Sequence, residues 1–181
     1  MKIHSVLSLA IAGTCLVGVV SLPDFSSTVA QAQTAARWQT YRAGNLYTIQ
    51  FPQGWQVTGD TDYLMLTNFD LNKGGGTAPQ SAIKTDIAIF PQPFDTVVQK
   101  AQQGKYTDAG DRIIKRGALK LGGRDAYRRW TTDSNFDFPD AITTYVRYGN
   151  QTVSITSFYT KQNPSAVPTI QQIHGSFRLL K

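Results

Sequence analysis

The sequence predicts an α+β domain in which helices pack on an antiparallel sheet of about six to eight strands. Short segments of alternating apolar and polar residues recur along the chain, separated by turns rich in Gly, Pro, Asn and Asp. Only two later segments have helical spacing instead. All 12 acidic residues are aspartates, and Asp favours turns and caps whereas Glu favours helix interiors.

Residues 1–32 are interpreted as a cleaved signal peptide. A short basic start precedes an apolar run from Val6 to Leu22, and Val29-Ala30-Gln31-Ala32 matches a small-residue cleavage site. The run is short for a membrane span, which needs about 20 apolar residues. A retained anchor and a lipidated Cys15 are the two alternatives.

After cleavage, residues 33–45 are expected to form an N-terminal tether and residues 46–181 a single domain. The chain has one cysteine, Cys15, which lies in the expected signal peptide. The remaining chain therefore has no thiol for a disulfide, a nucleophile or a metal site. Export without cysteine favours a bacterial periplasm or a thylakoid lumen.

The first half of the domain predicts strands joined by turns. Tyr47–Phe51 alternates in period two, Pro52 ends it, and a second strand from Trp55 to Thr58 is expected to pair with it as a hairpin. Tyr47, Phe51 and Trp55 are expected to be core and turn residues. Further strands are expected over 63–68 and 83–91, with a glycine-rich loop between them.

A helix is expected after Pro93, with Asp95 as its cap and Gly104 as its terminator. Two hairpins follow, one around Gly122-Gly123 and one around Gly149-Asn150. The last element is a helix that begins near Ser165 as its cap, carries apolar residues at helical spacing and ends at Gly175.

The basic residues of the second half are the leading candidate for a functional surface. The net formal charge is +6, which suits an acidic protein surface or an anionic membrane. The predicted partner-binding residues are Lys115, Arg128, Arg129 and Arg147, and Lys115, Arg129 and Arg147 would form a docking patch if they share one exposed face. The alternative is a set of solvated strand faces that protect sheet edges.

No motif points to a reaction. His174 is the only histidine after cleavage, and we expect it to lie partly exposed near the end of the last helix, where its charged form is favoured. Asp133, Asp137 and Asp140 share one loop and are weak candidates for Ca²⁺, which binds through several oxygens. We expect no cofactor and no other metal, and export disfavours nucleic acid as a partner.

Four segments in order carry a family resemblance. They are Tyr47–Val57 with its Pro-x-Gly-Trp turn, Arg124–Thr131 after Gly122-Gly123, Tyr145–Tyr159, and Ile170-x-x-Ile173-x-x-Ser176-Phe177. Together they resemble the PsbP-like family, the extrinsic proteins of photosystem II and their lumenal and cyanobacterial relatives. The resemblance implies an α/β/α sandwich, no enzymatic activity, and a binding or assembly role at a photosynthetic membrane complex.

We expect the protein to be a monomer that is at most peripheral to the membrane.

Two other functions stay open. The first is a periplasmic carrier of a small ligand or lipid, with a pocket lined by Trp55, Trp130 and Tyr145. The second is a hydrolase, which would require His174 to lie within hydrogen-bond reach of Ser and Asp side chains.

Overall fold

The computed structural model describes residues 37–73, 78–106, 111–133 and 137–180. The expected signal peptide and the Gly74-Gly75-Gly76 loop lie outside these residues. The elements in chain order are β1 (Trp38–Ala43), β2 (Tyr47–Pro52), β3 (Gln56–Gly59), β4 (Tyr63–Thr67), β5 (Ile83–Phe90), α1 (Phe94–Gln102), β6 (Arg112–Leu121), β7 (Arg124–Thr132), β8 (Asp140–Tyr148), β9 (Gln151–Tyr159), α2 (Ala166–Ser176) and β10 (Arg178–Leu179).

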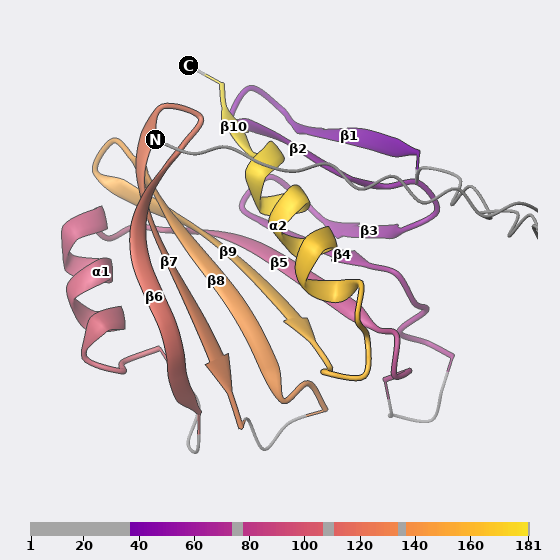
Figure 1. The fold of residues 1–181 in the computed structure, drawn as a ribbon. Helices are drawn as coiled ribbons and strands as arrows, with labels where there is room; N and C mark the ends of the chain where they lie inside the picture. The colour runs from indigo at the N-terminus through magenta and orange to yellow at the C-terminus, as the bar shows by residue number, and fades with distance from the viewer. Residues whose placement is uncertain (1–36, 74–77, 107–110, 134–136, 181) are drawn as a thin grey trace, which may run out of the picture. The chain divides into compact units, whose positions relative to one another are not determined.

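The strands form two antiparallel sheets (Figure 1). The small sheet has the order β1-β2-β10, and the large sheet has the order β3-β4-β5-β9-β8-β7-β6. The seven strands of the large sheet confirm the predicted α+β class and strand number. In this order β3 and β6 are the two edges of the large sheet, so β6 has a hydrogen-bonded neighbour on one side only.

Strand β2 does not pair with β3, so the predicted first hairpin is wrong. It pairs with β1 on one side and with β10 on the other, whereas β3 pairs with β4 in the large sheet. The turn after Pro52 therefore carries the chain from one sheet to the other. Tyr47 and Phe51 are buried at 0% and 2% exposure, and the half-buried Trp55 packs against two core clusters. The prediction that they are core and turn residues is confirmed.

The folded domain begins earlier than expected. Residues Trp38–Ala43, which fall inside the predicted tether, form β1 and pair with β2 along its whole length. The half-buried Trp38 and Tyr41 pack against the main core cluster. The expected domain start at residue 46 therefore lies too far along the chain.

Both predicted hairpins of the second half are confirmed. Gly122 and Gly123 have φ values of +55° and +80°, and they join β6 to β7 with Leu121 opposite Arg124. A two-residue loop of this kind requires φ above zero at both positions, which Gly adopts without steric cost. Gly149, with φ +56°, is the first residue of the two-residue loop between β8 and β9, a position where a hairpin turn with one positive φ value prefers Gly.

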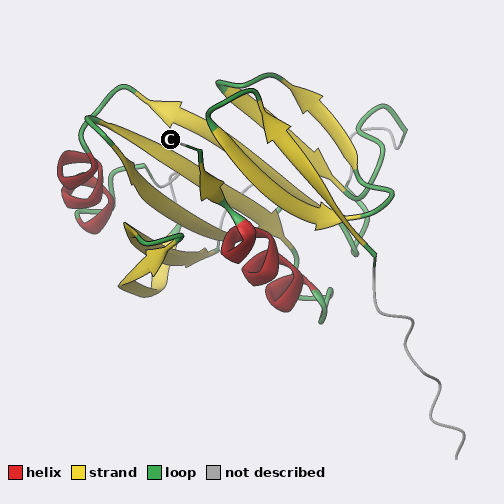
Figure 2. Cartoon of the chain, turned by 90° about the horizontal axis from the view of Figure 1, so that it is seen from above, coloured by secondary structure: helices red, strands yellow, loops and turns green. Residues whose placement is uncertain are grey.

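The two helices cover opposite faces of the large sheet. Along β8, Ile142 packs with α2, whereas Tyr145 packs with α1, and residues an odd number apart on a strand point to opposite faces. The small sheet joins α2 on its face, where Ile49 of β2 shares a cluster with Val146 of β8. Figure 2 shows α2 leading directly into the last strand.

The helix ends differ slightly from expectation. The N-cap of α1 is Pro93, and Asp95 lies in the first turn without capping it; instead it pairs with Arg147. Ser165 is the N-cap of α2, but its hydroxyl donates to Asn163 and not to the helix. The C-cap of α2 is Phe177, two residues beyond the predicted end at Gly175.

Candidate functional site

The four predicted partner-binding cations do not form one exposed patch. Lys115 and Arg128 lie on the α2 face, where both approach the ring of Trp130, with Lys115 Nζ 4.7 Å from the ring centroid. Arg129 and Arg147 lie on the opposite face. The expectation that Lys115, Arg129 and Arg147 share an exposed face is therefore wrong, because Lys115 points to the other side of the sheet.

Arg129 is also buried, at 4% exposure. Its guanidinium donates to the carbonyl oxygens of Lys105 and Tyr106 in the turn after α1, and it lies 5.7 Å from the ring of Tyr145. This turn covers the side chain, so Arg129 holds the α1 turn against the sheet.

The positive charge of the chain is nevertheless concentrated in one element, the β6–β7 hairpin. Residues 112–132 hold seven of the 18 basic residues and one of the 12 acidic residues. The rest of the chain then holds 11 of each, so this hairpin accounts for the whole net charge of +6. Five of the seven cations are exposed: Arg112, Lys115, Arg116, Lys120 and Arg124.

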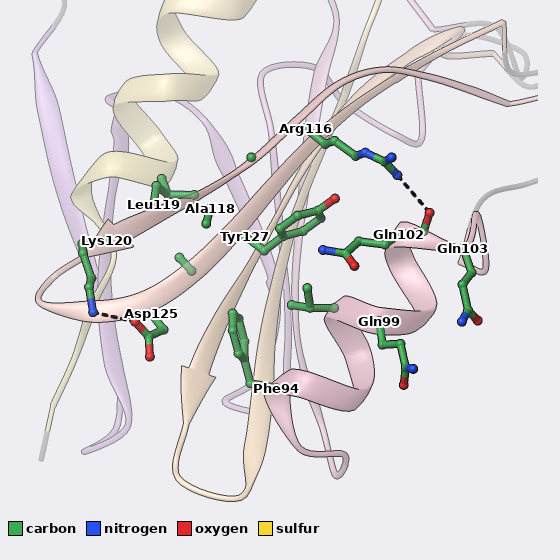
Figure 3. A pocket seen from close by; sticks show the side chains of 13 residues that line it. Phe94, Gln99, Gln102, Gln103, Arg116, Ala118, Leu119, Lys120, Asp125 and Tyr127 are labelled. Atoms are coloured by element: carbon green, nitrogen blue, oxygen red, sulfur yellow. Dashed lines mark hydrogen bonds and ion pairs between the residues drawn. The ribbon is translucent and has the colours of Figure 1, made fainter.

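A groove of about 890 Å³ runs between α1 and this hairpin (Figure 3). Phe94 and Tyr127 supply its aromatic wall, and Gln99 and Gln102 line it from the helix. The Arg116 guanidinium donates to the Gln102 carbonyl oxygen at 2.9 Å. The groove thus combines aromatic, amide and cationic groups, which suit a peptide or another polar ligand with an apolar part.

Ion pairs fix one end of the groove. Arg147 makes two bonds to Asp95 at 2.7 and 3.0 Å, and its Nε lies 3.4 Å from Asp125. Lys120 Nζ lies 2.5 Å from the same Asp125. The hydrogen bond from Arg147 lowers the pKa of Asp95, and the one from Lys120 lowers the pKa of Asp125. The pairs tie the start of α1 to β7 and β8.

His174 is not exposed, so the expectation of a charged residue at the helix end is wrong. It is fully buried, with Nδ1 2.8 Å from Thr144 Oγ1 and Nε2 2.9 Å from Ser157 Oγ. Burial, with a smaller contribution from Arg128, lowers the pKa of His174 to about 3, so the ring is neutral at pH 7. The Ser–His contact required by the hydrolase alternative is present, but Ser157 is also fully buried.

The three loop aspartates separate into different environments. Asp133 pairs with Arg112 at 3.0 Å, Asp137 is exposed, and Asp140 is buried and accepts a hydrogen bond from Thr132 at 2.6 Å. Within the described residues, no group of three or more His, Cys, Asp or Glu side chains is placed to hold a metal ion. The Ca²⁺ expectation therefore gains no support from this loop.

The pocket predicted from Trp55, Trp130 and Tyr145 does not exist as one site. Trp55 and Trp130 pack against the α2 cluster, whereas Tyr145 is in the α1 cluster on the other face. The groove instead uses Arg116, Lys120 and the α1 glutamines, which the sequence-based site omitted. The available signal was the alternation of β6, which places Arg116, Ala118 and Lys120 on one face.

Comparison with known proteins shows the fold and no family. No family model and no curated protein matches the chain. Among solved structures, LpqN, involved in cell envelope biogenesis of Mycobacterium tuberculosis, is 11% identical with a TM-score of 0.57, over 81% of this chain and 92% of that chain. PA94 from Pseudomonas aeruginosa, a protein of unknown function, is 16% identical with a TM-score of 0.50, over 77% and 94%.

The cyanobacterial PsbP protein CyanoP from Synechocystis is 14% identical with a TM-score of 0.47, over 92% of this chain and 98% of that chain. At these identities the first two structures show a shared fold alone. Among the residues that the structure describes, no helix has the length and apolar character needed to cross a membrane.

Proposed function

We propose that this chain is a non-catalytic, exported domain that binds a protein partner through the basic β6–β7 hairpin. The partner is an acidic surface of a photosynthetic membrane complex of the photosystem II kind, in the thylakoid lumen or periplasm. The PsbP-like pattern of the sequence supports this choice of partner, and the signal-like residues 1–32 support export. LpqN, which shares the fold, is involved in cell envelope biogenesis.

The concentration of charge in one hairpin carries the proposal. The hairpin holds the entire positive excess of the chain, and four of its five exposed cations lie on β6, the free edge of the large sheet. A surface patch of one charge sign raises the rate of encounter with an oppositely charged surface and sets the orientation in which the two surfaces dock. Because dissolved ions screen contacts between exposed charges, the binding is expected to weaken as the salt concentration increases.

The non-catalytic part of the proposal is supported by His174. General acid–base chemistry requires a titratable group that reaches the substrate. His174 and its neighbour Ser157 are both fully buried, and His174 is held neutral by its lowered pKa. The two side chains hydrogen-bond to each other inside the core, so each has a buried polar partner and a structural role.

The test measures retention of the protein on native thylakoid membranes at low and high salt. In the test variant Lys115, Arg116, Lys120 and Arg124 are all changed to Glu; in its control, four cations outside the hairpin, Arg37, Arg42, Lys73 and Lys161, are changed in the same way. We expect retention that falls with salt, is lost in the hairpin variant and persists in the control. Equal retention of both variants would contradict the proposal.

A second function, carriage of a small ligand or lipid, is favoured by the size of the groove. Its volume of about 890 Å³ lies within the range of about 300 to 1,000 Å³ typical of ligand sites. Filling it with Val98→Trp should displace a ligand that co-purifies with the protein, as measured by mass spectrometry of the extracted protein. Absence of any co-purifying small molecule from the native source would count against this function.

A further inference from the structure

We infer that the free edge of β6 accepts an extended acidic segment of the partner as an additional strand. This inference rests on the proposed function, because it specifies how the basic hairpin would hold a protein partner. Strand β6 is the last strand of the large sheet, and most of its ten residues are exposed. Within the described part of the chain, no strand pairs with its outer side.

The backbone groups that point outward can be assigned from the hairpin. A two-residue loop is flanked by a hydrogen-bonded pair, here Leu121 and Arg124, and such pairs alternate with non-hydrogen-bonded pairs along an antiparallel ladder. Arg116, Ala118 and Lys120 therefore belong to the second kind, whose N–H and C=O groups point away from β7. These groups form a regular edge available to another strand.

The same three residues define the side chains that the added strand should carry. Their side chains lie on the α1 face, next to the groove, and Arg116 and Lys120 are about 13 Å apart along the strand. Residues directly opposite each other on neighbouring strands interact. The added strand should place an acidic residue opposite Arg116, an apolar residue opposite Ala118 and a second acidic residue opposite Lys120.

The groove gives the apolar residue a place to bind. Ala118 is small, and the aromatic rings of Phe94 and Tyr127 line the groove beside it (Figure 3). A Cβ added at the neighbouring Gly117 would point to the α2 face and meet nothing within 4 Å, so the edge is also open on that face. The pattern acidic-x-apolar-x-acidic follows from the alternation of one strand.

The charges of β6 select the acidic segment over a second copy of this chain. Its ten residues contain four cations and no acid, so pairing between two β6 edges would place like charges across from one another, which is destabilising. Lys120 already contacts Asp125, so an acidic ligand competes with that exposed pair. Among the described residues, no carboxylate lies within ion-pair distance of Arg116. Its guanidinium donates to the Gln102 carbonyl oxygen and has further N–H donors for a carboxylate.

The experiment titrates the full protein with a synthetic peptide, Thr-Glu-Thr-Leu-Thr-Glu-Thr, by calorimetry and by amide hydrogen exchange. A matched isomer, Thr-Thr-Glu-Leu-Glu-Thr-Thr, has the same composition but places both acids on the face opposite the leucine. A third peptide repeats the first with N-methyl groups on the two glutamates and the leucine. We expect the isomer and the N-methylated peptide to bind about tenfold more weakly, and the first peptide to protect the Ala118 amide.

Protein variants separate this inference from the proposed function. The double variant Arg116→Glu with Lys120→Glu should bind the first peptide about tenfold more weakly. The double variant Arg42→Glu with Lys73→Glu should bind it with unchanged affinity. Equal binding of the parent and N-methylated peptides, or no binding of the parent, would overturn strand addition. If retention on membranes still depends on the hairpin cations, the proposed function survives that result; if it does not, both are overturned.

Discussion

His174 on α2 reaches into the large sheet, where its Nε2 lies 2.9 Å from Oγ of Ser157 on β9. The contact belongs to a buried chain of polar groups. Arg128 Nε donates to Thr144 Oγ1 at 2.8 Å, Thr144 lies 2.8 Å from Nδ1 of the histidine, and Ser157 lies 2.6 Å from Thr85 Oγ1. Because Thr144 already accepts from Arg128, its proton is available to Nδ1, which favours the tautomer protonated at Nε2.

The first prediction concerns acid stability. The pKa of His174 is lowered from 6.5 to about 3 in the folded protein, so below pH 6.5 the unfolded chain binds a proton that the folded chain does not. Stability therefore falls as the pH decreases from 6.5 toward 3. Between pH 7 and pH 5 the free energy of unfolding should fall by about 2 kcal/mol, measured by urea denaturation.

The two ion-paired carboxylates beside the groove do not contribute to the loss of stability between pH 7 and pH 5. Asp95 and Asp125 have lowered pKa values in the folded state, so the stability that they contribute is lost only below the ordinary Asp value of 3.8. The variant His174→Gln is the control and should be less stable at pH 7 but nearly insensitive to pH from 7 to 5. A wild-type protein with a flat profile over this range would show that the folded state protonates the histidine as readily as the unfolded chain does, which would contradict the lowered pKa.

The second prediction concerns Ser157. Its replacement by Ala leaves His174 Nε2 and the Thr85 hydroxyl without their buried partner, which should cost about 1–3 kcal/mol of unfolding free energy. Ser154 lies on the same strand with its side chain toward the α1 face, and its contact to Thr156 is long at 3.4 Å. Ser154→Ala should therefore cost less, and equal losses for the two variants would argue against the polar chain.

The third prediction concerns Gly59, at the end of β3. Its φ is +105°, and an added Cβ would collide with the carbonyl oxygen of Tyr63. Gly59→Ala should lower the free energy of unfolding by about 2 kcal/mol or more. Gly117→Ala is the control, since a Cβ there meets open space, and its effect should stay within about 0.5 kcal/mol. Chemical denaturation of the two variants gives the comparison.

The fourth prediction separates stability from binding at Arg129. Arg129→Met removes the two donors to the Lys105 and Tyr106 carbonyl oxygens and should cost about 1–3 kcal/mol of stability. Retention on membranes should be unchanged, because the side chain is buried. A folded Arg129→Met protein that is no longer retained on membranes would show that Arg129 contributes to binding.

Local signals in the sequence were sufficient for much of the fold. The pair Gly122-Gly123 fixes the β6–β7 hairpin because the loop itself requires positive φ values. Pairing between distant segments has no such local signal. Strand β2 pairs with β10 across about 130 residues, so the sequence around Pro52 showed where a strand ends but not which strand it joins.

The site was predicted less well, for two physical reasons. Exposure depends on tertiary cover, and a charged residue such as Arg129 is buried because backbone carbonyl oxygens of a distant turn accept its hydrogen bonds. The same holds for His174. Its position near the end of a helix suggested that the ring is exposed, but hydroxyl groups of β8 and β9 bind the ring in the core. The alternation of side chains along β6 could be predicted from the sequence, but the position of β6 at the edge of the sheet could not.

The pairing of β2 with both β1 and β10 has a kinetic consequence. The complete small sheet needs both residues 38–43 and residues 178–179, and the backbone N–H of Gln50 also donates to Ser176 Oγ at 2.8 Å. Contacts this far apart along the chain close late, because the intervening loop must first lose its entropy. In a nascent chain the β2–β10 pairing therefore forms only after residues 178–179 have been synthesised, so the small sheet is incomplete until then.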